Sequence, residues 1–300
     1  MCGIVGLHLK DPALEPRLGA LLVPMIEDLT GRGPDSAGLA LYDRGVPDGS
    51  LRWSLRGPDS GCDWSALAER LGEDIGQPTD IEVKVDVCLL TVKAPVDQVR
   101  ARLCQIAPQV SVVGVGEAMT LYKDVGTARQ VCDRYGIGSA DGYQGVGHTR
   151  MATESAVTTR HSHPFSPAPD LALVHNGSFS NHASIRRRLE DQGLTFETDN
   201  DSEVAARYIG DRLDQGDSLD DAMRMVLKDF DGFFTLLVTS RDEFAVMRDA
   251  FACKPLVVAE TEAYVAVASE YHALATLPGI DDARVFEPQP EEVHSWVVKK

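Results

Sequence analysis

The final third of the chain, residues 230–300, constrains the fold more than any other stretch. Short runs rich in β-branched and aromatic residues follow one another closely, and turn pairs such as Asp231-Gly232 and Pro278-Gly279 separate them. The expected strands are Phe233–Thr239, Phe244–Met247, Leu256–Ala259, Tyr264–Ala268 and His294–Val298. One helix, Ser269–Leu277, is expected within the run. Since strands with so little intervening helix pair with near neighbours, this region predicts antiparallel sheets.

The first two thirds of the chain mix helices with strands. Residues 16–29 place apolar side chains three and four apart, which predicts an amphipathic helix. Leu39–Tyr42 is typical of a strand, and Tyr122–Tyr135 of a strand end followed by a short helix. Further helices are expected over Ala183–Gln192 and from Ser202, a candidate N-cap, to Leu213.

Residues 57–118 have a different pattern and lie between glycine- and proline-rich ends. The expected elements are a helix at Trp64–Leu71, a strand at Ile81–Val92, a helix at Pro95–Ile106 and a strand at Val110–Val115. We therefore predict one domain over residues 1–300, interrupted at about 57–118 by an insert with its own small α/β layer.

The N-terminal stretch Met1-Cys2-Gly3-Ile4-Val5-Gly6 combines a thiol with a strand start. If Met1 is removed, Cys2 carries both a nucleophile and an α-amine whose ordinary pKa, about 7.7–8.0, suits a base near neutral pH. Chain ends are usually frayed, but Ile4–Leu7 predicts a strand that ties this end into a sheet. The alternatives are a catalytic N-terminus and an unremarkable free cysteine.

Composition narrows the class of protein. The 300 residues are 43% hydrophobic and carry a net charge of −17, which argues against nucleic acid or an anionic membrane as a partner. No stretch has the roughly 18 apolar residues of a membrane span, and no secretory signal precedes Cys2. The six cysteines lack CxxC spacing, and the His161-Ser162-His163 pair lacks further ligands nearby, so we predict no metal and a cytoplasmic location.

Polar segments with glycines mark candidate site loops. Residues 32–38 form a turn-rich connection, and residues 148–154, which follow a glycine-rich approach, are expected to be a site loop rather than a strand. The short strand Leu171–Val174 is expected to end at His175-Asn176-Gly177.

These segments together resemble the class II glutamine amidotransferase domain, the N-terminal-nucleophile type found in glucosamine-6-phosphate synthase, amidophosphoribosyltransferase, asparagine synthetase and glutamate synthase. The motifs that carry the resemblance occur in the family's order: Cys2-Gly3-Ile4-Val5-Gly6, Arg32-Gly33-Pro34-Asp35-Ser36-Ala37-Gly38, Gly147-His148-Thr149-Arg150-Met151-Ala152-Thr153, His163-Pro164, His175-Asn176-Gly177 and Asp201-Ser202-Glu203-Val204. The resemblance implies an α+β fold, a four-layer αββα sandwich of two antiparallel sheets between helices.

The resemblance also implies roles for individual residues. Cys2 is the expected nucleophile, and the Asn176 side chain with the Gly177 N–H is the expected oxyanion hole.

For the zwitterionic substrate L-glutamine, the resemblance assigns the α-carboxylate to Arg150 and the α-ammonium to Asp201, with a hydroxyl from Thr153. Arg32 and Asp35 are expected to shape and close the site. Glu154 departs from the histidine or glycine of several members, which leaves contacts on that side open.

The implied function is a stand-alone glutaminase subunit that passes ammonia to a separate synthase subunit, since no synthase module is expected on this chain. Residues 149–159 look most like subunits related to glutamate synthase, including the N-methylglutamate synthase type. No cofactor is expected on this chain, and any FMN would belong to the partner. The alternatives are an N-terminal-nucleophile amidase or acylase for another amide, and a non-catalytic regulatory subunit.

Overall fold

The computed structural model describes residues 2–58, 61–152 and 156–298, and its first sheet is the centre of the molecule. Seven strands form this sheet in the order β14-β12-β13-β1-β8-β2-β7. Their bounds are β1 Gly3–Leu9, β2 Ser36–Tyr42, β7 Met119–Val125, β8 Gln144–Arg150, β12 Val257–Glu260, β13 Tyr264–Ala268 and β14 Arg284–Phe286. Because β1 lies between β8 and β13, the N-terminal segment is held in the middle of the sheet.

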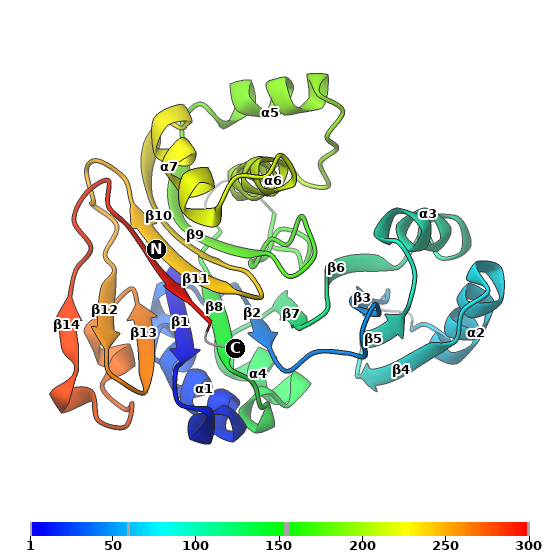
Figure 1. Cartoon of the computed structure of the whole chain (residues 1–300), viewed down its shortest axis with the longest axis horizontal. Helices are drawn as coiled ribbons and strands as arrows, with labels where there is room; N and C mark the ends of the chain where they lie inside the picture. The colour runs from blue at the N-terminus through cyan, green and yellow to red at the C-terminus, as the bar shows by residue number, and fades with distance from the viewer. Residues whose placement is uncertain (1, 59–60, 153–155, 299–300) are drawn as a thin grey trace.

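A second sheet packs face to face against the first (Figure 1). Its order is β15-β11-β10-β9, with β9 Ala172–Phe179, β10 Gly232–Thr239, β11 Glu243–Arg248 and β15 Val293–Val297. Buried side chains of both sheets, such as Ile4 and Val146 from the first and Leu237 and Phe244 from the second, fill the space between them. All the strand pairs of these two sheets are antiparallel among the described residues, as the C-terminal pattern predicted.

Helices cover the outer face of each sheet (Figure 1). Helices α1 Leu18–Asp28 and α4 Ala128–Tyr135 pack on the first sheet through a cluster that includes Leu22 and Val131. Helices α5 His182–Asp191, α6 Asp201–Asp214 and α7 Leu219–Asp229 pack on the second. The result is the αββα sandwich that the resemblance implied. Within the described ranges, no helix has the length and apolar character needed to cross a membrane.

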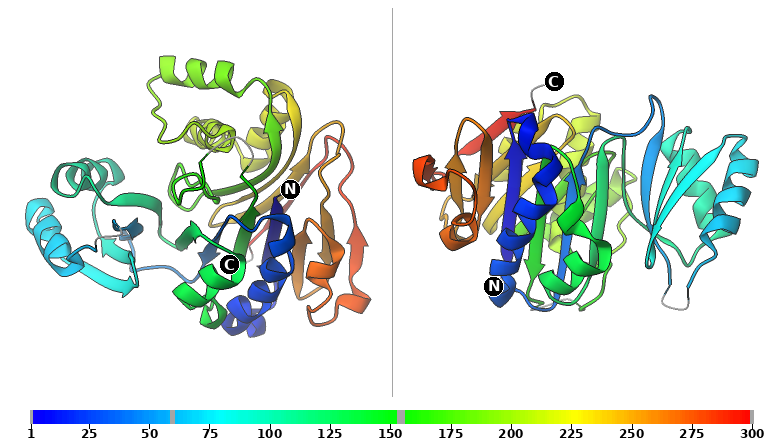
Figure 2. Two further views of the ribbon diagram at one scale, coloured as in Figure 1. Left: turned by 180° about the vertical axis from the view of Figure 1, so that it is seen from behind. Right: turned by 90° about the horizontal axis from the view of Figure 1, so that it is seen from below.

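The predicted insert is a third, four-stranded sheet to one side of the sandwich (Figure 2). Its elements are β3 Leu51–Arg56, α2 Trp64–Ile75, β4 Thr79–Lys84, β5 Val87–Val92, α3 Val96–Ile106 and β6 Ser111–Gly116. The order is β4-β5-β3-β6, so this sheet starts at Leu51 and not at about residue 57. The single strand predicted over Ile81–Val92 is a hairpin, because the chain turns at Val85, where φ is +58°.

The prediction of a loop at residues 148–154 is wrong as far as Arg150. Strand β8 is buried along its whole length and pairs with β1 on one side and β2 on the other. Gly145 and Gly147 leave room for Leu22 and Ile26 of α1, and His148 faces the second sheet. Tertiary packing therefore stabilises a strand whose sequence has little strand character.

Smaller differences concern helix ends and elements that were not predicted, of which β3 is one. The N-cap of α6 is Asn200, whose side chain accepts from the Ser202 N–H at 2.9 Å, and not Ser202 itself. The helix expected at Ser269–Leu277 is a 3₁₀ turn, Tyr271–Leu274. Helix α7 and strand β14 were not predicted. Short 3₁₀ turns also occur at Pro12–Arg17, Thr30–Arg32, Ile137–Ser139 and Ile280–Asp282.

Candidate active site

The N-terminus of β1 opens onto a cavity of about 410 Å³ where four of the eight predicted site residues meet. The cavity lies at the ends of β1, β8 and β9 and at the first turn of α6. Its lining residues are Cys2, Arg150, Met151, His163, His175, Gly177, Ser178, His182, Asp199, Asn200, Asp201 and Ser202. Four predicted site residues therefore share one cavity although they are as far apart in sequence as positions 2 and 201.

Cys2 is held by its backbone. Its carbonyl accepts hydrogen bonds from Arg32 Nε at 2.9 Å and from Asn176 Nδ2 at 3.2 Å. Among the described residues, the one hydrogen-bond contact of its thiol is long, 3.9 Å to the Met151 carbonyl. The next residue, Gly3, has no room for a side chain, since a Cβ would lie 2.6 Å from Thr149 Oγ1. The backbone is thus fixed while the sulfur stays available at the cavity.

Asn176 and Gly177 lie on β9, and Asn176 contacts Cys2. The Asn176 amide carries two N–H groups, and the contact with the Cys2 carbonyl uses one of them, which leaves the second as a donor. Gly177 has a φ of +147°, and a Cβ there would overlap the carbonyl oxygen of Phe233. Only glycine fits at this position, where β9 passes close to the backbone of β10.

Arg150 and Asp201 stand on different elements that face the same cavity. Arg150 ends β8, is 4% exposed, and donates from Nη1 to the Ala156 carbonyl at 2.9 Å. Burial lowers the pKa of Arg150, while the nearby Cys2 and Asp35 raise it. The Asp201 carboxylate accepts from the Phe179 N–H at 3.0 Å, so it is oriented by the strand that carries Asn176 and Gly177. A cation and an anion therefore lie at one site, as a zwitterion requires.

The predicted site-loop residues Arg32 and Asp35 support the site through the backbone. Besides its bond to the Cys2 carbonyl, Arg32 forms an ion pair with Glu270. Asp35 Oδ2 accepts from the Ala152 N–H at 2.8 Å, and the Asp35 N–H donates to the Arg150 carbonyl at 3.1 Å. Neither residue lines the cavity. Thr153, the predicted hydroxyl donor, and the neighbouring Glu154 lie outside the described residues.

Three buried histidines form a group that was not predicted from the sequence. His148 stacks on His163 with ring centroids 4.0 Å apart, and His175 lies beyond at 6.4 Å from His163. His148 Nε2 lies 2.9 Å from the His175 carbonyl, which only accepts, so Nε2 carries the proton. His175 Nδ1 lies 2.7 Å from Ser202 Oγ, which also donates to Asp201. Through Ser202, the histidine group is connected to the Asp201 carboxylate.

These imidazoles are neutral at neutral pH. Burial lowers the pKa of His148 to about 3, and burial also lowers the pKa of His163 and of His175. His163 has no hydrogen-bond partner on either ring nitrogen within residues 2–58, 61–152 and 156–298. The rings therefore supply an uncharged wall behind the nucleophile.

This neutral wall predicts acid sensitivity. We expect the free energy of unfolding to fall as pH drops below 6.5, because the unfolded chain then binds protons that the folded histidines do not. From 6.5 down toward about 3, His148 contributes about 1.4 kcal/mol per pH unit. His148→Gln keeps an N–H donor and removes one imidazole, so it should reduce this slope by about that amount in urea denaturation across the range.

The matched control for this measurement is His272→Gln, which removes an exposed imidazole that does not line the cavity. It is expected to leave the slope as in the parent protein. A slope that His148→Gln does not change would show that the His148 ring is not held neutral in the folded state.

No metal centre emerges from this geometry. Across the part of the chain that the structure describes, no three His, Cys, Asp or Glu side chains are placed to hold a metal ion. What the arrangement offers is a thiol, amide donors and an ion-binding pair, a set suited to acyl transfer from an amide.

Comparison with known proteins also points to amide chemistry, through similarity to glutamine amidotransferases. A family described as "Glutamine amidotransferase domain" matches residues 148–276. The "Glutamine amidotransferase-like protein GlxB" of Rhizobium meliloti is 47% identical over 297 residues, which span 99% of this chain and 98% of that protein. A "Putative glutamine amidotransferase" of Methanothermobacter thermautotrophicus is 33% identical, over 99% of this chain and 100% of that protein.

Among solved structures, the fold is similar to that of the glutamine phosphoribosylpyrophosphate amidotransferase from B. subtilis. The TM-score is 0.62 at 18% identity, and the match covers 99% of this chain and 49% of that one. At this identity the likeness establishes the fold alone.

Proposed function

Because this chain belongs to the class II glutamine amidotransferase family, we propose that it hydrolyses L-glutamine to glutamate and ammonia through a thioester on Cys2. The observation that carries the proposal is the convergence of Cys2, the Asn176-Gly177 pair, Arg150 and Asp201 around one cavity. A nucleophile, oxyanion donors and charges of both signs are what the hydrolysis of a zwitterionic amide requires.

In the proposed mechanism, removal of Met1 frees the α-amine of Cys2 to act as the base. The amine takes the thiol proton as sulfur attacks the side-chain amide carbon, and the tetrahedral oxygen receives donors from Asn176 and Gly177. The amine then gives the proton to the departing nitrogen, which leaves as ammonia. Water, deprotonated by the same amine, attacks the thioester, and glutamate leaves as the thiol is restored.

Substrate recognition follows from the two charged side chains. The Arg150 guanidinium would bind the α-carboxylate in a forked geometry, and Asp201 would pair with the α-ammonium. The Phe179 N–H donates to Asp201 Oδ2 and the Ser202 hydroxyl donates to Oδ1, and since each carboxylate oxygen accepts more than one hydrogen bond, both can still receive the α-ammonium. Thr153 keeps its proposed role as a hydroxyl donor. Arg32 and Asp35 would keep the nucleophile and Arg150 in place.

The proposal extends to the fate of ammonia. In water at neutral pH ammonia is protonated and loses its nucleophilicity, so we infer that a separate synthase subunit, glutamate synthase-like or N-methylglutamate synthase-like, receives it in the cytoplasm. The resemblance of residues 149–159 supports this partner class. Any FMN would be bound by that subunit.

The test is glutamate release from L-glutamine by protein whose N-terminus is Cys2. We expect release from L-glutamine and none from D-glutamine or from N-acyl amines, because only the L-zwitterion places its charges on Arg150 and Asp201 together. Faster cleavage of N-acyl amines would favour an amidase instead. Absence of hydrolysis and of alkylation by a glutamine-analogue electrophile, with the partner present, would favour a non-catalytic subunit.

A further inference from the structure

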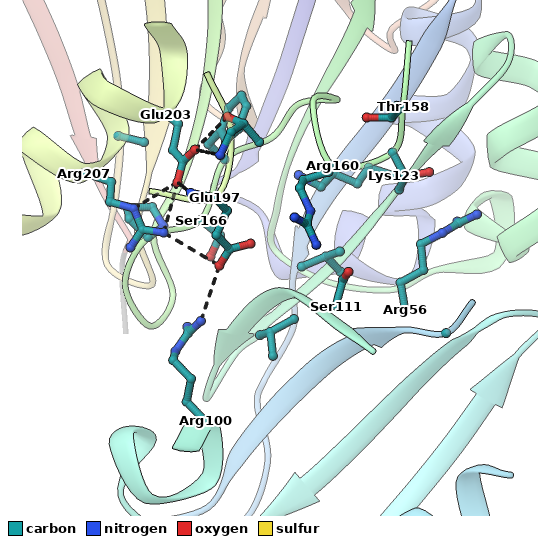
Figure 3. A pocket seen from close by; sticks show the side chains of 18 of the residues that line it. Arg56, Arg100, Ser111, Lys123, Thr158, Arg160, Ser166, Glu197, Glu203 and Arg207 are labelled. Atoms are coloured by element: carbon teal, nitrogen blue, oxygen red, sulfur yellow. Dashed lines mark hydrogen bonds and ion pairs between the residues drawn. The ribbon is translucent and has the colours of Figure 1, made fainter. Parts of the chain in front are cut away.

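A second cavity, of about 430 Å³, lies where the third sheet meets the sandwich, and the proposed reaction does not use it. The third sheet contributes residues such as Arg56 and Ser111, β7 contributes Lys123, and the segments 158–167 and 197–207 form the rest of the wall (Figure 3). Ion pairs and hydrogen bonds that cross the junction, such as Arg56 to Asp124 at 3.0 Å, fix the third sheet against the sandwich. The walls of the cavity are therefore held in place by contacts between the third sheet and the sandwich.

The charge of this cavity is opposite to that of the chain. The protein has a net charge of −17. Its second cavity, by contrast, is lined by five cationic side chains and only two carboxylates, which are Arg56, Arg100, Lys123, Arg160, Arg207, Glu197 and Glu203. A local excess of positive charge in a cleft attracts small anions.

Arg56, on the Lys123 side, is already paired with Asp86 and Asp124, and the charges of the other side are neutralised within the cavity (Figure 3). Arg207 Nε and Nη2 each lie 3.1 Å from Glu203 Oε1, and Arg100 lies 3.7 Å from Glu197 (Figure 3). Glu203 also accepts from the Thr198 N–H at 2.7 Å. This side of the cavity is an ordered polar network with little net charge.

The opposite side carries the uncompensated charge. Lys123 is 6% exposed, and its ammonium donates to the carbonyls of Ser162 at 2.9 Å and Pro164 at 3.2 Å, which leaves a third N–H. Burial lowers the pKa of Lys123 to about 8, as expected for an ammonium without a carboxylate in contact. The Arg160 side chain forms no hydrogen bond or ion pair within the described residues, and Figure 3 shows it on the same side as Lys123.

Hydroxyl groups and apolar side chains complete the lining. Ser166 Oγ is buried and has no hydrogen-bond partner among the described atoms, and Ser111 also faces the cavity (Figure 3). Val112 and Phe165 provide apolar surface. The volume exceeds that needed by an inorganic ion and falls in the range of small-molecule sites.

We propose that this cavity binds a small organic phosphate, with the phosphate group at Lys123 and Arg160 and the polar body reaching the Ser166 hydroxyl and the Glu197–Glu203 side. Lysine, arginine and serine donors match the oxygens of a phosphate monoester. The carboxylates and the unpartnered hydroxyl suit the hydroxyls of a sugar-like body.

The site is separate from the glutamine cavity. The two cavities have no lining residue in common, and Arg150 lines only the first. An anion that binds at Lys123 and Arg160 should therefore bind equally well when Arg150 is replaced.

The experiment is isothermal titration calorimetry of the full chain with glucose 6-phosphate, glucose and inorganic phosphate. We expect glucose 6-phosphate to bind, inorganic phosphate to bind more weakly, and glucose to give no heat. Arg160→Glu should weaken binding of glucose 6-phosphate by about tenfold or more, since it replaces a charged donor with a repelling carboxylate. Lys123→Gln should do the same, with thermal unfolding used to confirm that this buried variant is folded.

Two control variants test whether the phosphate binds at this cavity and not elsewhere on the protein. Arg187→Glu makes the same charge change on exposed α5, and Arg150→Gln alters the glutamine cavity; both should leave the dissociation constant unchanged. No heat from either phosphate at about 10 mM, or equal weakening by Arg187→Glu, would overturn the proposal. Loss of binding in Arg150→Gln would place the anion in the glutamine cavity, and this result would also overturn the proposal. Because binding is read directly, these outcomes do not depend on whether the protein hydrolyses glutamine.

Discussion

Cys2→Ala is expected to lower glutamate release from L-glutamine by at least about a thousandfold while leaving the protein folded. The side chain contributes little to stability, since its sulfur has only a 3.9 Å contact, whereas the backbone carbonyl makes the structural bonds to Arg32 and Asn176. Alanine keeps that carbonyl and removes the nucleophile. The measurement is glutamate formation under saturating glutamine, with thermal unfolding recorded for both proteins.

The matched control is Cys104→Ala, which removes an exposed thiol on α3 and should leave the rate unchanged. Mass spectrometry of the active protein should find Cys2 at the N-terminus, because the α-amine is the proposed base only after Met1 is removed. Equal rates for Cys2→Ala and the parent protein would refute the mechanism, and so would full activity in protein that retains Met1.

Half of the residues predicted for the candidate site line its cavity, because they stand in short motifs that the sequence displays directly. Cys2, Asn176, Gly177 and Asp201 each stand in a segment whose residue types suit one step of amide hydrolysis, and their order matches a known family. The spacing of these residues in the sequence does not predict that they meet, because β1, β9 and α6 are brought together by sheet pairing and by packing between layers. The resemblance supplied that long-range information.

Strand β8 shows where local pattern fails. Its glycines and polar side chains favour a loop, but the strand is buried on both faces, where Val146 and His148 pack toward the second sheet and Gly147 leaves space for Ile26. The requirement for small and polar residues is set by neighbours distant in sequence. The second cavity was missed for the same reason, because Lys123 and Arg160 form a site only when the third sheet closes over them.

The histidine group was missed for a related reason. In the sequence, His163 belongs to an HxH pair that suggests at most a metal site, and His148 and His175 are distant from it. The rings are brought together and buried only when β8, β9 and the segment that carries His163 pack against one another. Burial then decides their protonation, so the neutral wall is a property of the fold and not of the motif.

Asn176→Ala is expected to reduce kcat by about a hundredfold to a thousandfold with little change in KM. An oxyanion donor acts where charge develops, so its loss raises the energy of the tetrahedral intermediate more than that of bound glutamine. Asn176 is the informative member of the pair, because a side chain at Gly177 would overlap the Phe233 carbonyl and disturb the fold as well as the chemistry.

The measurement is steady-state kinetics of glutamate release, with Asn181→Ala as the matched control. Asn181→Ala removes the same side-chain amide from a residue at the start of α5. Because Asn181 contacts the Asp229 carbonyl and the Asp231 N–H, this variant should lower stability and leave kcat unchanged. A raised KM at unchanged kcat for Asn176→Ala would mean that the amide binds ground-state glutamine. In that case the second N–H of Asn176 does not serve the oxyanion, and the Gly177 N–H would have to carry the stabilisation with another donor of the cavity.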